Sequence, residues 1–267
     1  DARFDDLEMK YTETNCRVFD KYIYGNVIDL GGGSKTNKYL NKYSNRILNC
    51  VSVDNDINLI LKNLATGKIN KNKFGENMRY GFIDFTIPIS KYNVLQKQLS
   101  LNEIDFSYNF NTILMINSIN FALKSESSTE TLFNYLDNIA EKGTKLIIRW
   151  MDLDAFENKY TEYQKTNLFE TEYNYITGKI TIPSLVDSSF VNIDILNKTN
   201  RIYYKWAHDK PIDETIIGKK DLISLMDKKR WKFIDYENNS GYDKLKNSFS
   251  LWDLYFKSFS YIVFEKS

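Results

Sequence analysis

The chain has 267 residues, and its 36 lysines and arginines nearly balance its 35 aspartates and glutamates, giving a formal net charge of +1. This length suits one α/β domain with a large core, and the charge balance excludes the basic excess needed for non-specific binding along nucleic acid. Cys16 and Cys50 are the only cysteines and form no CxxC pair, so the sequence supports neither a disulfide framework nor a structural zinc site.

No apolar run approaches the about 18 residues that would span a bilayer. We therefore expect no membrane contact, and the two isolated cysteines lead us to expect a reducing cytoplasmic setting and no bound metal. The first residue is Asp1 rather than Met, and a polar stretch leads directly into ordered-looking sequence. We expect the chain to be a domain excised from a larger polypeptide.

From Asn26 onward, short apolar runs alternate with helix-like segments. This rhythm is typical of a parallel sheet that is covered by helices on both faces. The predicted strands are Val27–Leu30, Leu48–Val53, Tyr80–Phe85, Thr112–Asn117 and Lys145–Trp150. The predicted helices between them are Lys35–Tyr43, Ile57–Leu64, Tyr92–Leu99 and Glu130–Ala140.

The helix at Glu130–Ala140 has the clearest end signals, because the segment from Ser127 to Glu130 has capping-box spacing and Gly143 stands where a C-terminal cap would lie. The regular rhythm then lapses over about residues 151–211, which are polar and rich in tyrosine. We interpret this stretch as an inserted substrate lid within a single domain, 1–267. The last predicted elements are a helix at Lys219–Lys229 and strands at Trp231–Tyr236 and Phe259–Phe264.

The most informative segment runs from Val27 to Ser34, where an apolar strand enters a turn of three glycines and then a helix. Glycines at such a turn let the backbone approach a ligand closely. Asp54 closes the next strand, 23 residues after Gly31, near the offset of about 20 residues at which a carboxylate meets ribose hydroxyls. The two features together predict a nucleoside site, although tight packing alone also produces glycine turns.

A dinucleotide-binding dehydrogenase is the functional alternative to this reading. Its fingerprint requires a third glycine or alanine where this chain has Thr36. A cofactor without a pyrophosphate, such as S-adenosylmethionine, depends less on that residue.

Asp84 and Phe85 end the third predicted strand, and Asp84 could accept from an adenine amino group while Phe85 borders the ring. A helix cap or a solvated loop residue is the plainer reading of Asp84.

Three segments together resemble a class I S-adenosylmethionine-dependent methyltransferase: the strand with its glycine turn, Val51–Asp54 and Ile83–Phe85. This resemblance implies a Rossmann-like α/β fold with a mostly parallel sheet and a terminal antiparallel strand. The later segments resemble the cap guanine-N7 methyltransferase domain of poxvirus-type mRNA capping enzymes. The resemblance extends from about Arg17 to Lys266. Phe110–Leu123 matches the family's fourth-strand motif, and Met151–Asp154 matches its Met-Asp-x-Asp motif. Pro211–Ile217 matches its Pro-x-x-Glu segment, and Phe259–Lys266 matches its terminal strand ending in Phe-Glu-Lys.

The chain departs from the family at several positions. Asn120 and Phe121 replace a His-Tyr pair, so Asn120 can form hydrogen bonds but cannot carry a proton, and Phe121 keeps a stacking face but lacks the hydroxyl. Ile116 stands where relatives often have a polar residue, which leaves only backbone contacts to the cofactor there.

The resemblance implies methyl transfer from S-adenosylmethionine to N7 of the 5′ cap guanine, with no acid, base or covalent residue and with positioning by Glu214 and Phe121. The implied cofactor-binding residues are Asp29, Gly31, Gly32, Gly33, Asp54, Asp84, Phe85 and Ile116, and the implied cap guanine-binding residues are Asn120, Phe121, Glu214 and Phe259.

The implied partners are 5′-capped RNA, other capping domains on the same polypeptide and a stimulatory subunit. A catalytically silent methyltransferase-like subunit and a non-cap methyltransferase are the alternatives. The plain reading of Glu214 is a solvated charge, and that of Phe121 and Phe259 is core packing. His208 is read as a solvated loop histidine. A basic group could meet the cap phosphates or form a solvated helix face: Lys219, Lys220, Lys228, Lys229 and Arg230.

Overall fold

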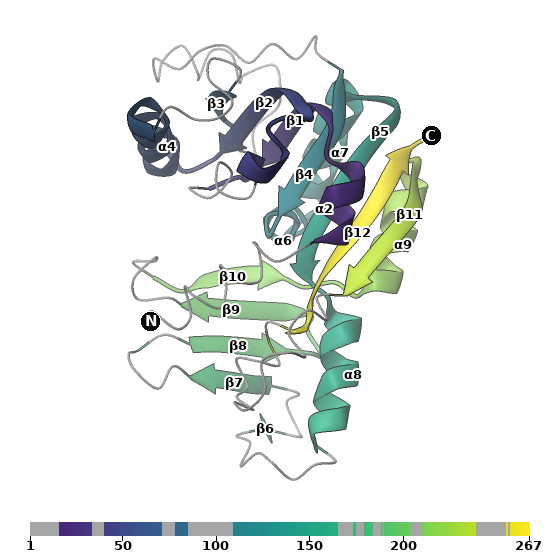
Figure 1. The fold of residues 1–267 in the computed structure, drawn as a ribbon. Coiled ribbons are helices and arrows are strands. Elements are labelled where there is room, and N and C mark those ends of the chain that lie inside the picture. The colour runs from purple at the N-terminus through teal and green to yellow at the C-terminus, as the bar shows by residue number, and fades with distance from the viewer. Residues whose placement is uncertain are drawn as a thin grey trace. The chain divides into compact units, whose positions relative to one another are not determined.

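The structure is a computed structural model that describes residues 16–33, 40–70, 78–84, 109–164, 173–174, 179–183, 188, 190–203, 210–238, 255 and 257–267 (Figure 1). The chain divides into two compact units. The first, here called the sheet unit, contains Asn15–Arg149, Met226–Tyr236 and Tyr261–Ser267. The second, here called the insertion unit, includes Trp150–Leu225 and Glu237–Ser260.

A seven-stranded sheet with the order β11-β12-β5-β4-β1-β2-β3 is the main sheet of the described chain. Its strands are β1 (Gly25–Leu30), β2 (Ile47–Asp54), β3 (Met78–Phe82), β4 (Phe110–Ile116), β5 (Ala140–Met151), β11 (Trp231–Asn238) and β12 (Phe259–Lys266). The neighbours from β3 through β5 pair in parallel. The arrow of β12 runs opposite to β5 and β11 in Figure 1. The predicted mostly parallel sheet with an antiparallel terminal strand is therefore confirmed.

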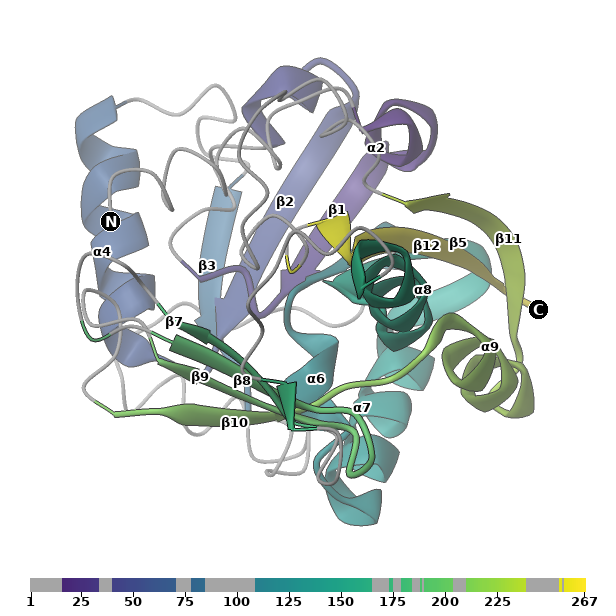
Figure 2. The same cartoon turned by 90° about the horizontal axis from the view of Figure 1, so that it is seen from below.

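Helices that belong wholly to the sheet unit are α2 (Arg17–Tyr22), α4 (Ile57–Asn70), α6 (Ile119–Ala122) and α7 (Glu126–Ile139), with a 3-10 turn η1 (Asn41–Tyr43). Figure 2 shows α4 alongside β3 at one end of the sheet. Ile60 of α4 and Tyr80 of β3 are both buried in this contact, with Leu64 and Phe82 packed around them. Ile57, Ile60 and Leu64 form the apolar stripe that α4 packs against β3, whereas Leu61 is exposed.

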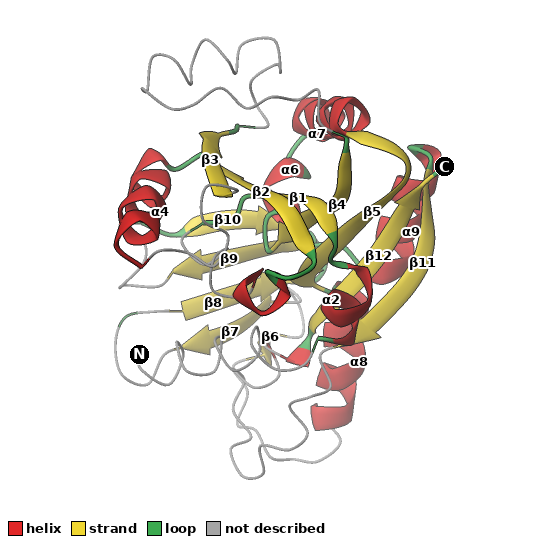
Figure 3. Cartoon of the chain, turned by 45° about the horizontal axis from the view of Figure 1, so that its top comes forward, coloured by secondary structure: helices red, strands yellow, loops and turns green. Residues whose placement is uncertain are grey.

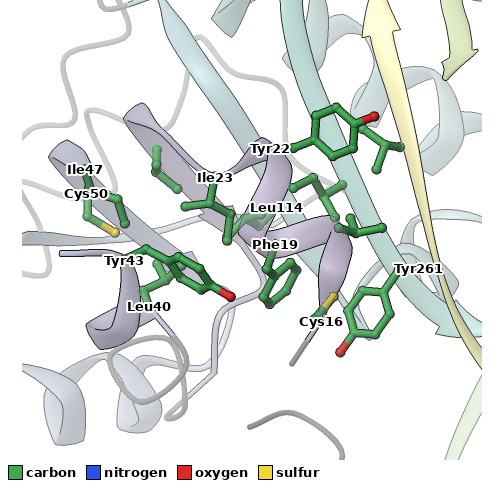
Figure 4. Packing of buried hydrophobic residues seen from close by; sticks show 14 residues of the cluster. Cys16, Phe19, Tyr22, Ile23, Leu40, Tyr43, Ile47, Cys50, Leu114 and Tyr261 are labelled. Atoms are coloured by element: carbon green, nitrogen blue, oxygen red, sulfur yellow. The ribbon is translucent and has the colours of Figure 1, made fainter. Parts of the chain in front are cut away.

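The core of the sheet unit lies under α2 and η1 (Figure 4). The ring of Phe19 meets Tyr261 and Tyr43 edge to face, with centroid distances of 5.2 and 6.2 Å. Cys16 and Cys50 are buried free cysteines in the same cluster. The pair of Phe19 and Tyr261 holds α2 against β12.

Some predicted boundaries differ from the structure. The third strand is Met78–Phe82 rather than Tyr80–Phe85. Of the helix predicted at Lys35–Tyr43, the described part contains Leu40 and the 3-10 turn Asn41–Tyr43, and the rest lies outside the described residues. The helix predicted at Tyr92–Leu99 also lies outside them.

The start of α7 lies earlier than predicted, because Ser125 rather than Ser127 is its N-cap. The Ser125 hydroxyl accepts from the Ser128 amide at 3.1 Å, and the Ser128 hydroxyl accepts from the Ser125 amide at 3.1 Å. This reciprocal pair satisfies two backbone donors, so the helix begins at Glu126. Gly143 is not the C-cap: the helix ends at Ile139, and Gly143 lies in β5 with φ +91°.

The insertion unit has regular structure, so the expected lapse after Trp150 is wrong. It contains a helix and short antiparallel strands in the order β10-β9-β8-β7-β6 (Figure 3). These elements are α8 (Leu153–Gln164), β6 (Tyr173–Asn174), β7 (Lys179–Pro183), β8 (Phe190–Asp194), β9 (Thr199–Tyr203) and β10 (Ile212–Thr215). Phe156 and Tyr160 of α8 stack at 5.9 Å and share a core with Ile180, Val191 and Ile202 of the strands. Strands this short, with one polar face, give only a weak sequence pattern.

The Met-Asp-x-Asp segment at Met151–Asp154 joins two helices of the described chain. Asp152 is 1% exposed, and its Oδ1 accepts from the amides of Asp154 and Lys219, each at 3.1 Å. Asp154 Oδ2 accepts from the Lys220 amide at 3.2 Å. The two carboxylates therefore cap the start of α9 (Lys219–Lys228), where unpaired amides favour negative charge. In the described part of the chain, no helix is long and apolar enough to span a membrane.

Candidate functional site

The candidate site lies at the carboxyl ends of the central strands of the sheet unit. From β1 the chain proceeds to β2 and β3 on one side, and β4 and β5 lie on the other side of β1. The strand order therefore reverses between β1 and β4. In open α/β sheets, ligands bind beyond the carboxyl ends of the strands at such a reversal.

The glycine turn after β1 is fastened to both neighbouring strands. The amides of Gly31 and Gly32 donate to the carbonyl of Val53 on β2 at 2.8 and 3.1 Å. On the β4 side, the Ser118 hydroxyl donates to the Leu30 carbonyl. Gly31 has φ +80°, a conformation that side chains disfavour. The turn is therefore held in one geometry by contacts that require its glycine.

Gly33 is not crowded by the described residues. It has φ +54°, and among those residues a Cβ placed on it would meet only Leu59 Cδ1, in ordinary contact at 4.0 Å. The Gly33 amide donates to Asp54 Oδ2 at 2.8 Å. The glycine turn of β1 and the acid of β2, predicted from their spacing, thus meet in the structure.

Asp54 is 9% exposed, and both of its carboxylate oxygens accept backbone hydrogen bonds. Oδ2 accepts from Gly33, and Oδ1 accepts from the Asp56 amide at 2.9 Å. Burial raises the pKa of Asp54, and the backbone donors partly oppose that rise. Each carboxylate oxygen keeps further acceptor capacity, which suits a pair of neighbouring hydroxyl groups.

Asp84 follows β3 at the same edge and is partly buried. The amide of the preceding residue, Ile83, donates to the Asp54 carbonyl at 2.9 Å, so the ends of β2 and β3 are joined. Phe85, the predicted neighbour of the adenine ring, lies outside the described residues. Asp29 is fully buried within β1, and its charge adds to burial in raising the pKa of the Cys50 thiol.

The end of β4 contains a polar pair that the sequence analysis missed. Ile116 is partly buried and packs on the core cluster around Phe19, as a strand residue would. The next residue, Asn117, has φ +60°, and its side-chain oxygen accepts from Arg149 NH1 at 2.6 Å. Arg149 is 1% exposed and lies on β5. A lone arginine in the apolar run Leu146–Met151 was the available sequence signal.

The residues assigned to the cap guanine belong to both units. Asn120 and Phe121 lie on α6 of the sheet unit, where Asn120 is 2% exposed and Phe121 is 37% exposed. Lys124 Nζ lies 5.3 Å from the centre of the Phe121 ring. Phe121 is therefore partly exposed with Lys124 over its ring, whereas the Asn120 side chain is packed inside.

Glu214 and Phe259 belong to the insertion unit. Glu214 is partly buried on β10, in register with Asn200 of β9. Phe259 is 7% exposed and packs edge to face on Tyr255 at 5.1 Å within the core of that unit. The structure thus places Phe259 in a packed core, and it brings Asn120 and Phe121 together in the other unit.

The remaining candidates are His208 and the basic group near α9. His208 lies outside the described residues. Among the basic residues near α9, Lys229 pairs with Glu130 at 2.6 Å and lies over the Phe133 ring at 5.3 Å, as a helix-face lysine would. Within the described ranges, no group of three or more His, Cys, Asp or Glu side chains could hold a metal ion.

No protein-family model matches this chain, and no curated protein sequence matches it. Solved structures do resemble it. The CcbJ methyltransferase from Streptomyces caelestis has a TM-score of 0.61 at 9% identity, covering 97% of this chain and 90% of its own. An S-adenosylmethionine-dependent methyltransferase from Clostridium acetobutylicum has a TM-score of 0.56 at 11% identity, covering 100% of this chain and 98% of its own.

The glycopeptide N-methyltransferase MtfA, solved with S-adenosylhomocysteine, has a TM-score of 0.54 at 10% identity, covering 94% of this chain and 85% of its own. Identities this low show the fold alone. The chain has the Rossmann-like class I methyltransferase fold, which confirms the predicted fold class.

Proposed function

We propose that this chain is an S-adenosylmethionine-dependent methyltransferase that methylates N7 of the guanine in the 5′ cap of mRNA. The observation that supports it best is the bond of 2.8 Å between the Gly33 amide and Asp54 Oδ2. It joins the glycine turn and the acidic residue into one structure at the point where ligands bind in this kind of sheet. The solved structures of the same fold are of methyltransferases, one of them with S-adenosylhomocysteine.

The residues present fit S-adenosylmethionine. Asp54 offers acceptor oxygens to the two ribose hydroxyls, and among the described residues only Leu59 would lie near a side chain at Gly33. In this proposal Asp84, which follows β3 at the adjoining strand end, accepts from the adenine amino group. When bound, the cofactor supplies a methyl group on a positively charged sulfur.

The chemistry proposed for the chain is alignment rather than acid or base catalysis. Guanine N7 has an in-plane lone pair, so its methylation needs no general base. Holding two reactants in line can contribute up to about 7–11 kcal/mol to lowering the barrier. Because positive charge moves onto the purine, a carboxylate near the base favours the transition state.

Two residues support guanine as the acceptor. Glu214 lies in the Pro211–Ile217 segment, which resembles the family's guanine-binding segment, and its carboxylate can accept from N1–H and the exocyclic amine, an edge that adenine does not offer. Phe121 has a partly exposed ring, as a stacking residue requires. We further propose that other capping domains share the polypeptide and that a stimulatory subunit assists this one.

One observation favours a second candidate, a methyltransferase with a different acceptor. Asn120 replaces the histidine of the cap family and is 2% exposed, so its side chain is not presented to a base. A non-cap methyltransferase would keep the cofactor site and need neither Asn120 nor Glu214.

The test combines cofactor binding with methyl transfer. Calorimetric titration with S-adenosylhomocysteine comes first, and absence of binding would refute the methyltransferase proposal as a whole. Transfer of labelled methyl is then measured on GpppA-capped RNA, with m7GpppA-capped and ApppA-capped RNA as matched controls. We expect transfer to the first substrate only. The protein could bind the cofactor and yet transfer no methyl group to GpppA-capped RNA. If a longer capping polypeptide gives the same result, a methyltransferase with a different acceptor is favoured.

A further inference from the structure

We propose that the Asn117 carboxamide binds the carboxylate at the amino-acid end of the cofactor, and that Arg149 is the positioning residue that sets the direction of this carboxamide. The inference rests on the proposed cofactor and concerns a part of the site to which neither the sequence pattern nor the resemblance assigned a residue. It begins from the backbone of Asn117.

Asn117 has an uncommon backbone conformation at the carboxyl end of β4. Its φ of +60° lies in the left-handed region, which few residues other than glycine adopt, although asparagine adopts it more often than most. The main chain is fixed there because the Asn117 amide donates to the Arg149 carbonyl at 2.8 Å. Strained positions of this kind cluster at ligand-binding sites, where the surrounding structure maintains them.

The direction of the Asn117 side chain follows from the chemistry of its partner. A guanidinium group has donors and no acceptor, so only the carboxamide oxygen can face it. Arg149 NH1 lies 2.6 Å from Oδ1 of Asn117. The Nδ2 group, with its two N–H donors, is consequently the end that points away from Arg149. Asn117 is partly buried, so a ligand at this edge can reach it.

Arg149 is itself held firmly. Its backbone is in register with Ile116 of β4, its side chain is 1% exposed, and its guanidinium carbon lies 5.9 Å from the centre of the Tyr261 ring. Donation from a charged group polarises the Asn117 amide and strengthens its N–H groups as donors. A negatively charged acceptor gains most from such a donor.

The position of Asn117 selects the part of the cofactor. Asp54 and Asp84, the residues proposed for the nucleoside, end β2 and follow β3, on one side of β1. Asn117 follows β4, on the other side of β1. Ligands at such a reversal lie across it, beyond the carboxyl ends of the strands, so a cofactor with its nucleoside toward β2 would direct its amino-acid end toward β4. Of the charged groups there, the sulfonium and the ammonium accept no hydrogen bond, and only the carboxylate does.

The experiment compares two ligands that differ at this end. S-adenosylhomocysteine has the amino-acid group, and 5′-methylthioadenosine has the same nucleoside and thioether without it. Asn117→Asp keeps the shape of the side chain and a partner for Arg149 but replaces the N–H donors with a second acceptor. We expect its affinity for S-adenosylhomocysteine to fall by at least about tenfold, the scale of one charge-assisted hydrogen bond. Affinity for 5′-methylthioadenosine should stay within about twofold.

Arg149→Met frees the Asn117 carboxamide to rotate. It should therefore also weaken S-adenosylhomocysteine binding more than 5′-methylthioadenosine binding. Asp54→Ala is the matched control and should weaken both ligands together. An unchanged affinity of Asn117→Asp for S-adenosylhomocysteine, or an equal loss for both ligands, would overturn the proposal. Loss of methyl transfer with S-adenosylhomocysteine affinity intact would place Asn117 at the methyl acceptor and would also overturn it. A wild-type protein that binds neither ligand would instead refute the proposed function.

Discussion

Gly31 lies so close to Ser118 that a Cβ atom added to the glycine would stand 2.5 Å from the serine Cβ. No real side chain tolerates that distance, and φ at Gly31 is +80°. The contact joins the end of β1 to the residue that precedes α6, across the reversal of strand order. The glycine is therefore needed for packing between two strand ends as well as for the shape of the turn.

Gly31→Ala should lower the free energy of unfolding by about 2–4 kcal/mol, since it adds left-handed strain to an overpacked contact. Gly33→Ala is the matched control, with φ +54° and, among the described residues, only an ordinary contact to Leu59 at 4.0 Å, and should cost only about 1 kcal/mol. Urea denaturation of both variants measures the difference. A larger loss for Gly33→Ala would contradict the packing role of Gly31.

Cofactor affinity should depend on the ionisation of Asp54. Burial raises the pKa of this carboxyl above the ordinary 3.8, and the protonated form offers fewer acceptors to the ribose hydroxyls. Affinity for S-adenosylhomocysteine should therefore be greatest above the raised pKa and decline as pH falls through it, at a higher pH than for an exposed aspartate. Asp54→Ala should lose about 1.5–3 kcal/mol of binding free energy at pH 7.5 and show a flatter profile. The measurement is calorimetry at several pH values on protein shown to be folded. If the wild type and Asp54→Ala share one pH profile, Asp54 does not belong to the site.

Asp84→Asn should weaken S-adenosylhomocysteine binding less than Asp54→Ala does. The asparagine keeps the size of the side chain and one acceptor for the adenine amino group. The two variants are compared in one calorimetric series at constant pH. If Asp84→Asn produces the greater loss, the assignment of these two acids to adenine and ribose is wrong.

Glu214→Gln should reduce methyl transfer to GpppA-capped RNA by at least about 2 kcal/mol in activation free energy while S-adenosylhomocysteine affinity stays constant. The glutamine replaces one acceptor with a donor that faces a guanine N–H, and it removes the charge that favours the cationic product. Single-turnover transfer is the measurement.

Asp213→Asn on the same strand is the control for Glu214→Gln. The carboxylate of Asp213 is exposed and lies 3.7 Å from Arg201 Nε, so this change should leave transfer unaffected. Full activity of Glu214→Gln would refute guanine recognition by this residue. Loss of cofactor binding together with activity would indicate a role in the scaffold.

Asp235 should stabilise the sheet unit by fastening β11 to α2. Arg17 donates to both of its oxygens at 2.8 Å, and the Tyr22 hydroxyl donates at 2.9 Å. The Arg17 hydrogen bonds hold the pKa of Asp235 far below its usual value. The stabilisation is therefore complete above about pH 4, the unfolded-state value, and is lost as pH falls further.

At pH 7, Asp235→Asn should cost about 1–2 kcal/mol of unfolding free energy, since half of the Arg17 side chain is exposed. The gap from the wild type should narrow on acidification below pH ~4. Chemical denaturation at several pH values tests this. A gap that is independent of pH would show that the loss does not arise from the charge of Asp235.

The sequence by itself determined the features that depend on neighbouring residues. The apolar runs fixed the central strands because a strand covered on both faces must be apolar, and the glycines between Leu30 and Ser34 fixed the turn because other residues disfavour its backbone. The spacing from Gly31 to Asp54 placed an acid at the adjacent strand end, and the structure joins the two through Gly33. The five strands predicted before Trp150 all overlap observed strands.

Only the tertiary structure decided which distant residues meet. The packing of β4 and α6 against other elements decides three features. They are the contact of Gly31 with Ser118, the hydrogen bond from Arg149 to Asn117 and the burial of Asn120. The insertion unit formed a sheet where the sequence showed no rhythm, because short strands with one polar face resemble loops until pairing buries the other face. Local patterns reflect backbone preference and burial on a single element. The polar groups that meet at strand ends are selected by register and packing between elements, which a linear pattern does not record.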